Sequence, residues 1–294
     1  MTRRQSYESP AAFRRGLTDK LKVIAANGKW SLTQLQRQIA YDRLLERLYL
    51  VDGGWVVKGA AALLARDIGV RATIDIDLYR KLACEAAERE MREAVGHDIG
   101  DWFRFEAGPS RAVAMAVRIP VTARIGTVWA EFHVDLQGEG LVMTGDPEPM
   151  PPLARIIMPD IEQHGYQVYP LVDHIADKIT ATVQRYGEGE LPSTRYKDLV
   201  DLVAIIREAS IQSTAQMAAL RSEAARRKLT LPRRFAVPDR PLWEAGYASE
   251  AQRSLLETAL TLDEALAAVE PFIDPLLDGT AAGTWVPELA AWHT

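Results

Sequence analysis

The alternation of hydrophobic and polar residues predicts two N-terminal helices, then a mixed group of strands and helices, and a mainly helical second half. Ser9 and Ser31 each precede apolar residues at helical spacing, as N-cap residues do, which predicts helices ending near Asn27 and before Asp52. Further helices are predicted at residues 60–66, 84–95, 171–186 and 196–208. Strands are predicted at residues 55–57, 73–78, 102–106, 113–122, 127–136 and 167–170. This order of elements predicts an α+β fold.

A proline-rich stretch from Gly145 to Pro152 has the composition of a linker. We expect it to separate two domains. Residues 1–152 would hold the N-terminal helices and a mixed-sheet core, and residues 153–294 a mainly helical lobe. A length of 294 residues, of which 48% are hydrophobic, is enough for one large core or two smaller ones.

The composition excludes several classes of protein. The single cysteine, Cys84, cannot form an intramolecular disulfide and falls in a predicted helix. No stretch approaches the roughly 20 apolar residues that span a bilayer, and no apolar run follows the basic N-terminus, so we expect a cytoplasmic protein. The net charge of −5 excludes a uniformly basic protein that coats nucleic acid.

The first candidate for chemistry is the pair Asp75 and Asp77. Residues two apart on a strand point to the same face, so two carboxylates project side by side, with Thr73 next to them. Carboxylates this close repel each other, and a divalent cation with oxygen preference, most plausibly Mg²⁺, relieves the repulsion. A solvated, charged strand face is the alternative explanation.

A second charged face lies on the strand predicted at residues 127–136. Glu131, His133 and Asp135 alternate with apolar residues there, so they share one face. Asp135 could supply a third metal carboxylate, whereas we interpret Glu131 and His133 as exposed polar positions. No HxxH or HExxH spacing indicates zinc.

Lys58 and Gly59 close one predicted strand and open the next helix. Backbone N–H groups at a helix start favour an anion, and a lysine beside a glycine suits a phosphate. The segment is not a Walker A loop, because GxxxxGK[ST] is absent.

Lys178 stands among apolar residues on a predicted helix, where an ammonium group needs a counter-ion. Asp198 or Asp201 on the next helix could provide it. Two readings remain open. The lysine and the aspartate form an interhelical ion pair that stabilises a bundle, or the lysine binds a triphosphate and the aspartate holds it in position.

These four features, in this order, resemble the AbiEii/AbiGii-type nucleotidyltransferase toxins, a group that includes the MenT-like toxins of toxin–antitoxin systems. The family pattern of KGG, TxDID, a lysine-bearing helix and RxKDxxD is matched by Lys58-Gly59-Ala60, Thr73-Ile74-Asp75-Ile76-Asp77, Ala176-Asp177-Lys178-Ile179 and Arg195-Tyr196-Lys197-Asp198-Leu199-Val200-Asp201. The resemblance covers about residues 55–202, and Ala60 replaces the second glycine of the pattern.

The resemblance implies a polymerase-β-like nucleotidyltransferase core, a helical C-terminal lobe and a Mg²⁺-dependent reaction. It implies that an NTP is the co-substrate, that pyrophosphate leaves, and that the acceptor is the 3′ end of a tRNA, with growth arrest as the result. A separately encoded antitoxin would be the protein partner, and a monomer is our working expectation. The implied catalytic set is Asp75, Asp77, Lys178 and Asp198; the implied nucleotide-binding set is Lys58, Gly59, Thr73 and Lys178; the implied metal ligands are Asp75, Asp77 and Asp135.

An RNA acceptor requires a basic surface. One cluster comprises Arg226, Arg227, Lys228, Arg233 and Arg234, with Phe235 available for stacking on a base. A second comprises Arg3, Arg4, Arg14 and Arg15. Charge runs are usually solvated surface, which is the alternative interpretation of both clusters.

Two other functions compete with nucleotidyl transfer to RNA. The same core could transfer a nucleotide to a protein, as in adenylylation. It could also be a non-catalytic module that binds nucleic acid through its basic surface, in which case Asp75 and Asp77 would be dispensable.

Overall fold

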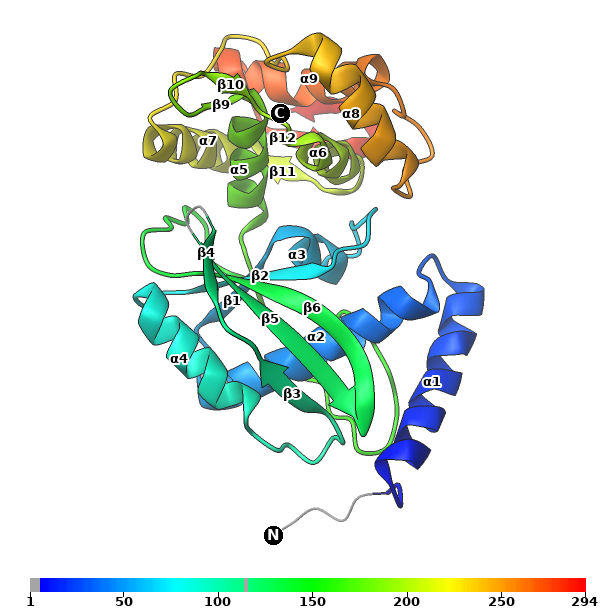
Figure 1. Cartoon of the computed structure of the whole chain (residues 1–294). Coiled ribbons are helices and arrows are strands. Elements are labelled where there is room, and N and C mark those ends of the chain that lie inside the picture. The colour runs from blue at the N-terminus through cyan, green and yellow to red at the C-terminus, as the bar shows by residue number, and fades with distance from the viewer. Residues whose placement is uncertain (1–5, 114–115) are drawn as a thin grey trace. The chain divides into compact units, whose positions relative to one another are not determined.

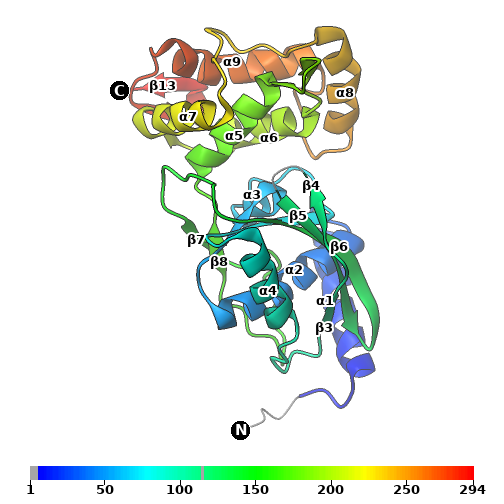
Figure 2. The same cartoon turned by 60° about the vertical axis from the view of Figure 1, so that its left-hand side comes forward.

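The computed structural model describes residues 6–113 and 116–294, and its contacts divide the chain into two units (Figures 1 and 2). Unit 1 comprises the described residues up to Arg66, then Ala72–Leu141 and Glu148–Val168. Unit 2 comprises Asp67–Arg71, Val142–Pro147 and Tyr169–Thr294. Asp67–Arg71 and Val142–Pro147, two short segments of the N-terminal half, therefore belong to unit 2. A single boundary placed from composition alone does not predict such an exchange of segments. Arg3 and Arg4 lie outside the described residues.

Unit 1 is built from helices and a mixed sheet, which confirms the α+β prediction. Its helices are α1 (Pro10–Asn27), α2 (Leu32–Val51), α3 (Gly59–Ala65) and α4 (Cys84–Val95). Its strands are β1 (Trp55–Lys58), β2 (Asp75–Arg80), β3 (Arg104–Ala107), β4 (Arg111–Val113), β5 (Ala116–Ile125), β6 (Thr127–Gln137), β7 (Glu148–Met150) and β8 (Tyr166–Val168). The strand order is β3-β5-β6-β2-β1-β8-β7, with β4 also pairing with β5; β2 runs parallel to β6 and β1 to β8.

The predicted helix starts are confirmed by their caps. The Ser9 side chain accepts a hydrogen bond from the Ala12 N–H at the start of α1. Ser31 and Gln34 form a reciprocal capping box at the start of α2. These bonds satisfy backbone donors that have no partner inside the helix.

Strand alternation determines which face of the sheet is buried. Ile76 and Leu78 of β2 and Val134 and Leu136 of β6 belong to one hydrophobic core with residues of α2 and α4. Asp77 and Asp135, which lie between these core residues, and Asp75, which precedes them on β2, are only partly buried. The charged positions singled out in the sequence therefore stand on the face opposite this core.

A bulge sets the register between β5 and β6. Near their hairpin Arg124 pairs with Val128, but from Ala123 onward the pairing shifts by one, because Trp129 is an extra residue on β6. Trp129 is buried, and its indole N–H donates to the Gln36 carbonyl. The shift gives residues 117–123 of β5 different partners on β6 from those that an unbroken hairpin would give.

Three sequence-based boundaries need correction. The strand predicted at 113–122 is two strands, β4 and β5; residues 114 and 115 between them lie outside the described residues. The linker-like stretch contains β7, an edge strand. Prolines are tolerated at a sheet edge, because backbone N–H groups there need not pair with another strand, so its proline content resembles that of a linker. The helix predicted at 171–186 ends at Val183.

Unit 2 is mainly helical. Its helices are α5 (Leu171–Val183), α6 (Tyr196–Glu208), α7 (Ser213–Arg227), α8 (Arg240–Gln252) and α9 (Leu262–Asp278), with a 3-10 turn η1 (Pro287–Leu289). Its short strands are β9 (Arg185–Tyr186), β10 (Leu191–Pro192), β11 (Ile211–Gln212), β12 (Thr284–Val286) and β13 (Ala291–His293). Buried Trp243 and Trp285 donate their indole N–H groups to the carbonyls of Ser193 and Ile206 and so join loop and helix backbone to the core.

Candidate active site

A row of four charged residues crosses the face of the unit 1 sheet that lies opposite the core. Lys58 on β1 pairs with Asp77 on β2, Asp77 pairs with Asp135 on β6, and Asp135 pairs with Arg118 on β5. Residues in register on neighbouring strands project from the same face. The sheet therefore brings together Lys58, Asp77 and Asp135, as predicted, and adds Arg118.

Asp75 extends this row by one position along β2. The Thr73 hydroxyl donates to the Asp75 carboxylate and lies 2.9 Å from the Asp75 carbonyl oxygen, while the Tyr41 hydroxyl donates to the Thr73 carbonyl at 3.2 Å. Thr73 is buried, whereas the Asp75 side chain is 34% exposed. The threonine thus orients a carboxylate that remains accessible to a ligand.

Gly59 is required by the position of Asp77. Its backbone has φ +59°, a conformation that side chains disfavour, and a Cβ at this position would collide with the Asp77 carboxylate. The glycine thereby lets that carboxylate lie against the start of α3. Ala60 is buried in the core, and the Lys58 ammonium donates to the Gln137 side-chain oxygen at 2.8 Å.

Arg118 binds Asp135 through two parallel hydrogen bonds. Its Nε lies 2.7 Å from Oδ1 and its Nη2 lies 2.5 Å from Oδ2. Nη2 is also 3.7 Å from an Asp75 oxygen. The hydrogen bond to Asp135 is the main cause that raises the pKa of Arg118, so the guanidinium stays charged.

The acidic face fits a divalent cation in part. Asp75 and Asp77 offer carboxylate oxygens from one face of one strand, which is the donor chemistry of Mg²⁺. Asp135 has both oxygens occupied by Arg118. Among residues 6–113 and 116–294, no group of three His, Cys, Asp or Glu side chains is arranged to hold a metal ion.

The lysine motif of the sequence forms a charged cluster within unit 2. The Lys178 ammonium on α5 lies 2.9 Å from an Asp198 oxygen and 2.6 Å from an Asp201 oxygen, both on α6. Arg195 binds the other Asp198 oxygen at 2.6 Å, and Arg71 binds Asp201 with two hydrogen bonds. The predicted interhelical ion pair is therefore present, with both candidate aspartates engaged.

Burial strengthens the electrostatic interactions among the charged side chains of this cluster. Only 3% of the Lys178 side chain is exposed. Burial would lower the pKa of Lys178, but the charges of Asp198 and Asp201 outweigh it and raise the pKa. Burial would likewise raise the pKa of Asp201, but Lys178 and Arg71 hold it well below its usual value. Lys178 and Asp201 are therefore both ionised at neutral pH.

The basic cluster proposed for RNA is divided by the structure. Arg227 binds Glu223 and Asp177 at 2.6 and 2.5 Å, and Arg226 binds Glu223 at 2.5 Å, so both serve the packing of α7. Lys228, Arg233 and Arg234 are exposed. Phe235 is only 4% exposed, which corrects the expectation that its ring could stack on a base. In the second cluster, Arg14 donates to the carbonyls of Thr127 and Val128.

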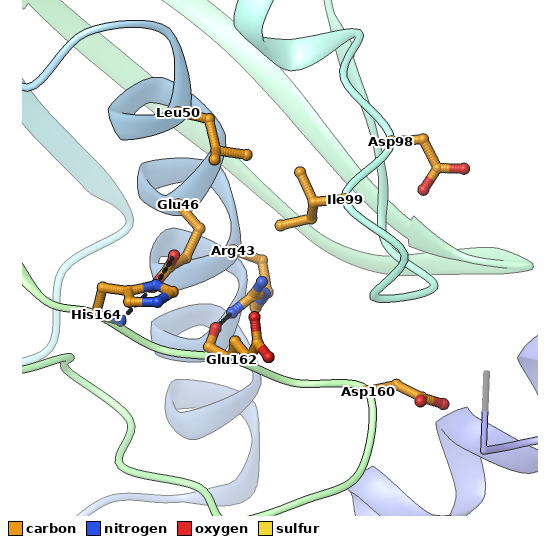
Figure 3. A pocket seen from close by; sticks show the side chains of 8 residues that line it. All are labelled: Arg43, Glu46, Leu50, Asp98, Ile99, Asp160, Glu162 and His164. Carbon is orange, nitrogen blue, oxygen red and sulfur yellow. Dashed lines mark hydrogen bonds and ion pairs between the residues drawn. The ribbon is translucent and has the colours of Figure 1, made fainter. Parts of the chain in front are cut away.

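A hollow of about 270 Å³ elsewhere in unit 1 contains none of the predicted site residues (Figure 3). Figure 3 shows His164 beside Glu46 and Arg43 directed at the Glu162 carbonyl. The His164 Nδ1 atom lies 2.9 Å from a Glu46 carboxylate oxygen. Buried Arg43, which lines the hollow, and buried Arg47 both bind Asp101. These contacts anchor α2 to the loop before β3, a structural role that the helical pattern of α2 did not reveal.

The mixed sheet carries the paired aspartates of β2 and the lysine–glycine turn that the sequence motifs share with nucleotidyltransferases. Residues 43–277 match the family described as nucleotidyl transferase AbiEii toxins of type IV toxin–antitoxin systems. The chain therefore belongs to the AbiEii nucleotidyltransferase toxin family, which confirms the resemblance seen in its motifs.

One solved structure shares the fold. The chain is similar to MenT4, a nucleotidyltransferase toxin of Mycobacterium tuberculosis H37Rv, with a TM-score of 0.50 and 16% identity over 90% of this chain and 98% of that one. It is also similar to JHP933 from Helicobacter pylori, with a TM-score of 0.45 and 14% identity over 86% of this chain and 91% of that one. No curated protein matches the sequence. No helix in the described part of the chain is long and apolar enough to cross a membrane.

Proposed function

We propose that this nucleotidyltransferase moves a nucleoside monophosphate from an NTP to an RNA, at the 3′ end of a tRNA, and releases pyrophosphate. The observation that carries the proposal is the pair Asp75 and Asp77, held on one strand face with Thr73 orienting the first and Gly59 admitting the second. Two adjacent carboxylates repel each other, and a bound divalent cation relieves that repulsion.

Asp75 and Asp77 would hold Mg²⁺. When bound, the metal ion would polarise the α-phosphate and stabilise the leaving oxygen of an in-line displacement. Lys58, in register with Asp77, would bind the triphosphate. Thr73 would keep Asp75 in its binding orientation through the hydroxyl hydrogen bond.

We assign Lys178 and Asp198 to the same reaction. Their cluster holds three cationic side chains, Lys178, Arg71 and Arg195, against the two aspartates. This surplus of positive charge favours a triphosphate. Arg71, which binds Asp201, precedes Asp75 by only four residues in the sequence.

The biological outcome would be growth arrest, relieved by a separately encoded antitoxin. Lys228, Arg233 and Arg234 are the exposed basic residues available to an RNA. Expression of the wild-type chain should slow growth, and Asp75→Asn should remove this effect.

The direct test incubates the chain with total tRNA and each labelled NTP, with and without Mg²⁺. We expect label on tRNA only with Mg²⁺, and none with Asp75→Asn. Glu131→Gln is the matched control, since Glu131 is an exposed carboxylate on the adjacent strand β6. Equal transfer by Asp75→Asn and Glu131→Gln would contradict the proposal. Label on a co-purified or added protein instead of tRNA would replace the RNA acceptor with a protein acceptor.

A further inference from the structure

Arg118 lies in the acidic row without belonging to any of the sequence motifs. The bidentate contact with Asp135 fixes its guanidinium plane, because two parallel hydrogen bonds define both the distance and the orientation of the fork. Its side chain is 28% exposed, so it is reachable from solvent on the face that carries Asp75 and Asp77.

One end of this guanidinium remains available. Nε and Nη2 are used by Asp135, and Nη2 also approaches Asp75. Within the described residues, Nη1 donates no hydrogen bond. A guanidinium can donate five N–H bonds, and planar, bidentate recognition of phosphate is the use to which arginine is best suited.

The charge of the row points in the same direction. Three carboxylates, Asp75, Asp77 and Asp135, face two cations, Lys58 and Arg118. A divalent cation on Asp75 and Asp77 would turn the net charge of this face from negative to positive. Arg118 would then be repelled by the metal ion and attracted by an anion between them, while Asp135 would keep it in place.

We propose that Arg118 binds the phosphates of the incoming NTP, and that Asp135 is its positioning residue and not a metal ligand. This assignment rests on the proposed function and deepens it. The metal set is then Asp75 and Asp77 alone, and Asp135 acts only through the orientation of the guanidinium.

The test measures binding in the absence of any acceptor. Affinity for Mn²⁺ is followed by electron paramagnetic resonance, and affinity for inorganic tripolyphosphate with Mg²⁺ by calorimetry. Arg118→Gln should weaken tripolyphosphate binding by about ten- to a hundredfold, the loss of a charge-assisted hydrogen-bond pair, with Mn²⁺ affinity unchanged. Arg118→Lys, which keeps the charge but not the fork, should fall between wild type and Arg118→Gln.

Asp135→Asn separates the two roles of that carboxylate. We expect it to keep Mn²⁺ affinity and to weaken tripolyphosphate binding, while Asp75→Asn loses Mn²⁺ affinity. An Mn²⁺ affinity that falls as far in Asp135→Asn as in Asp75→Asn would overturn the assignment, as would unchanged tripolyphosphate binding by Arg118→Gln. These readouts need no transfer reaction, so a failure of the proposed function and a failure of the Arg118 assignment give different results.

Discussion

The two charged groups of this nucleotidyltransferase differ in burial and in charge balance. The row on the unit 1 sheet is partly exposed, and its carboxylates outnumber its cations. In the cluster around Lys178 in unit 2, Lys178 and the two aspartates are buried, and the cations outnumber the carboxylates. Removing one member of a buried ion pair leaves an uncompensated charge, whereas removing an exposed carboxylate from an acidic row relieves repulsion. The cluster should therefore contribute to stability as well as to activity, and the row to activity alone.

The largest expected effect on stability comes from Lys178→Met. It leaves Asp198 and Asp201 buried without their shared ammonium, which should cost about 3–5 kcal/mol of unfolding free energy. Denaturant unfolding measures this cost, and hydrogen exchange assigns it to α5 and α6. A variant that unfolds at the wild-type denaturant concentration would show that the ion pairs do not stabilise unit 2.

Gly59→Ala should have the next largest effect. The new Cβ meets the Asp77 carboxylate in a backbone conformation that alanine disfavours, so we expect a cost of about 1–3 kcal/mol and displacement of Asp77. The free-energy loss calculated from the fall in transfer rate should exceed the loss of unfolding free energy. Gly53→Ala is the control, because a Cβ there meets no atom within 4 Å; similar activity in both variants would remove the reason given for Gly59.

Asp201 in unit 2 and Asp42 in unit 1 should contribute to the pH dependence of stability with opposite signs. The folded-state pKa of Asp201 lies below its unfolded value, so its contribution is present above about pH 4 and is lost as the pH falls below that. Burial raises the pKa of Asp42 on α2 to about 7 despite hydrogen bonds from Leu153, Ala154 and Tyr166. Its contribution is full below about pH 4 and is lost as the pH rises to 7.

Substitution of each aspartate tests these signs. Asp42→Asn should flatten the loss of unit 1 stability between about pH 4 and 7, and Asp201→Asn should flatten the acid loss in unit 2. Hydrogen exchange across this pH range distinguishes the units. A decline between pH 4 and 7 that persists in Asp42→Asn would contradict the assignment to that carboxyl.

The sequence predicted the parts of the site that depend on local pattern. Alternation placed Asp75 with Asp77 and aligned Asp135 with Glu131, because a strand period of two is readable within a few residues. The ion pair between Lys178 and α6 was also predicted, since an ammonium in an apolar stripe requires a partner.

The features that were missed depend on pairing between distant residues. An unbroken hairpin would pair Arg118 with Val134 and turn it toward the buried face, and only the extra residue at Trp129 brings it opposite Asp135. Arg71 was missed because its partner Asp201 is far along the chain. Buried Arg43 looks like a solvated helix position until Asp101 is placed beside it.

The central claim is that the acidic row performs the chemistry and is not needed for folding. It is tested most directly by measuring nucleotide transfer to tRNA and unfolding free energy together for Asp77→Asn, with Glu131→Gln as the control. The account predicts a loss of transfer of about a thousandfold or more in Asp77→Asn, with unfolding free energy within about 1 kcal/mol of wild type, and no change in Glu131→Gln. Wild-type transfer by Asp77→Asn would contradict it.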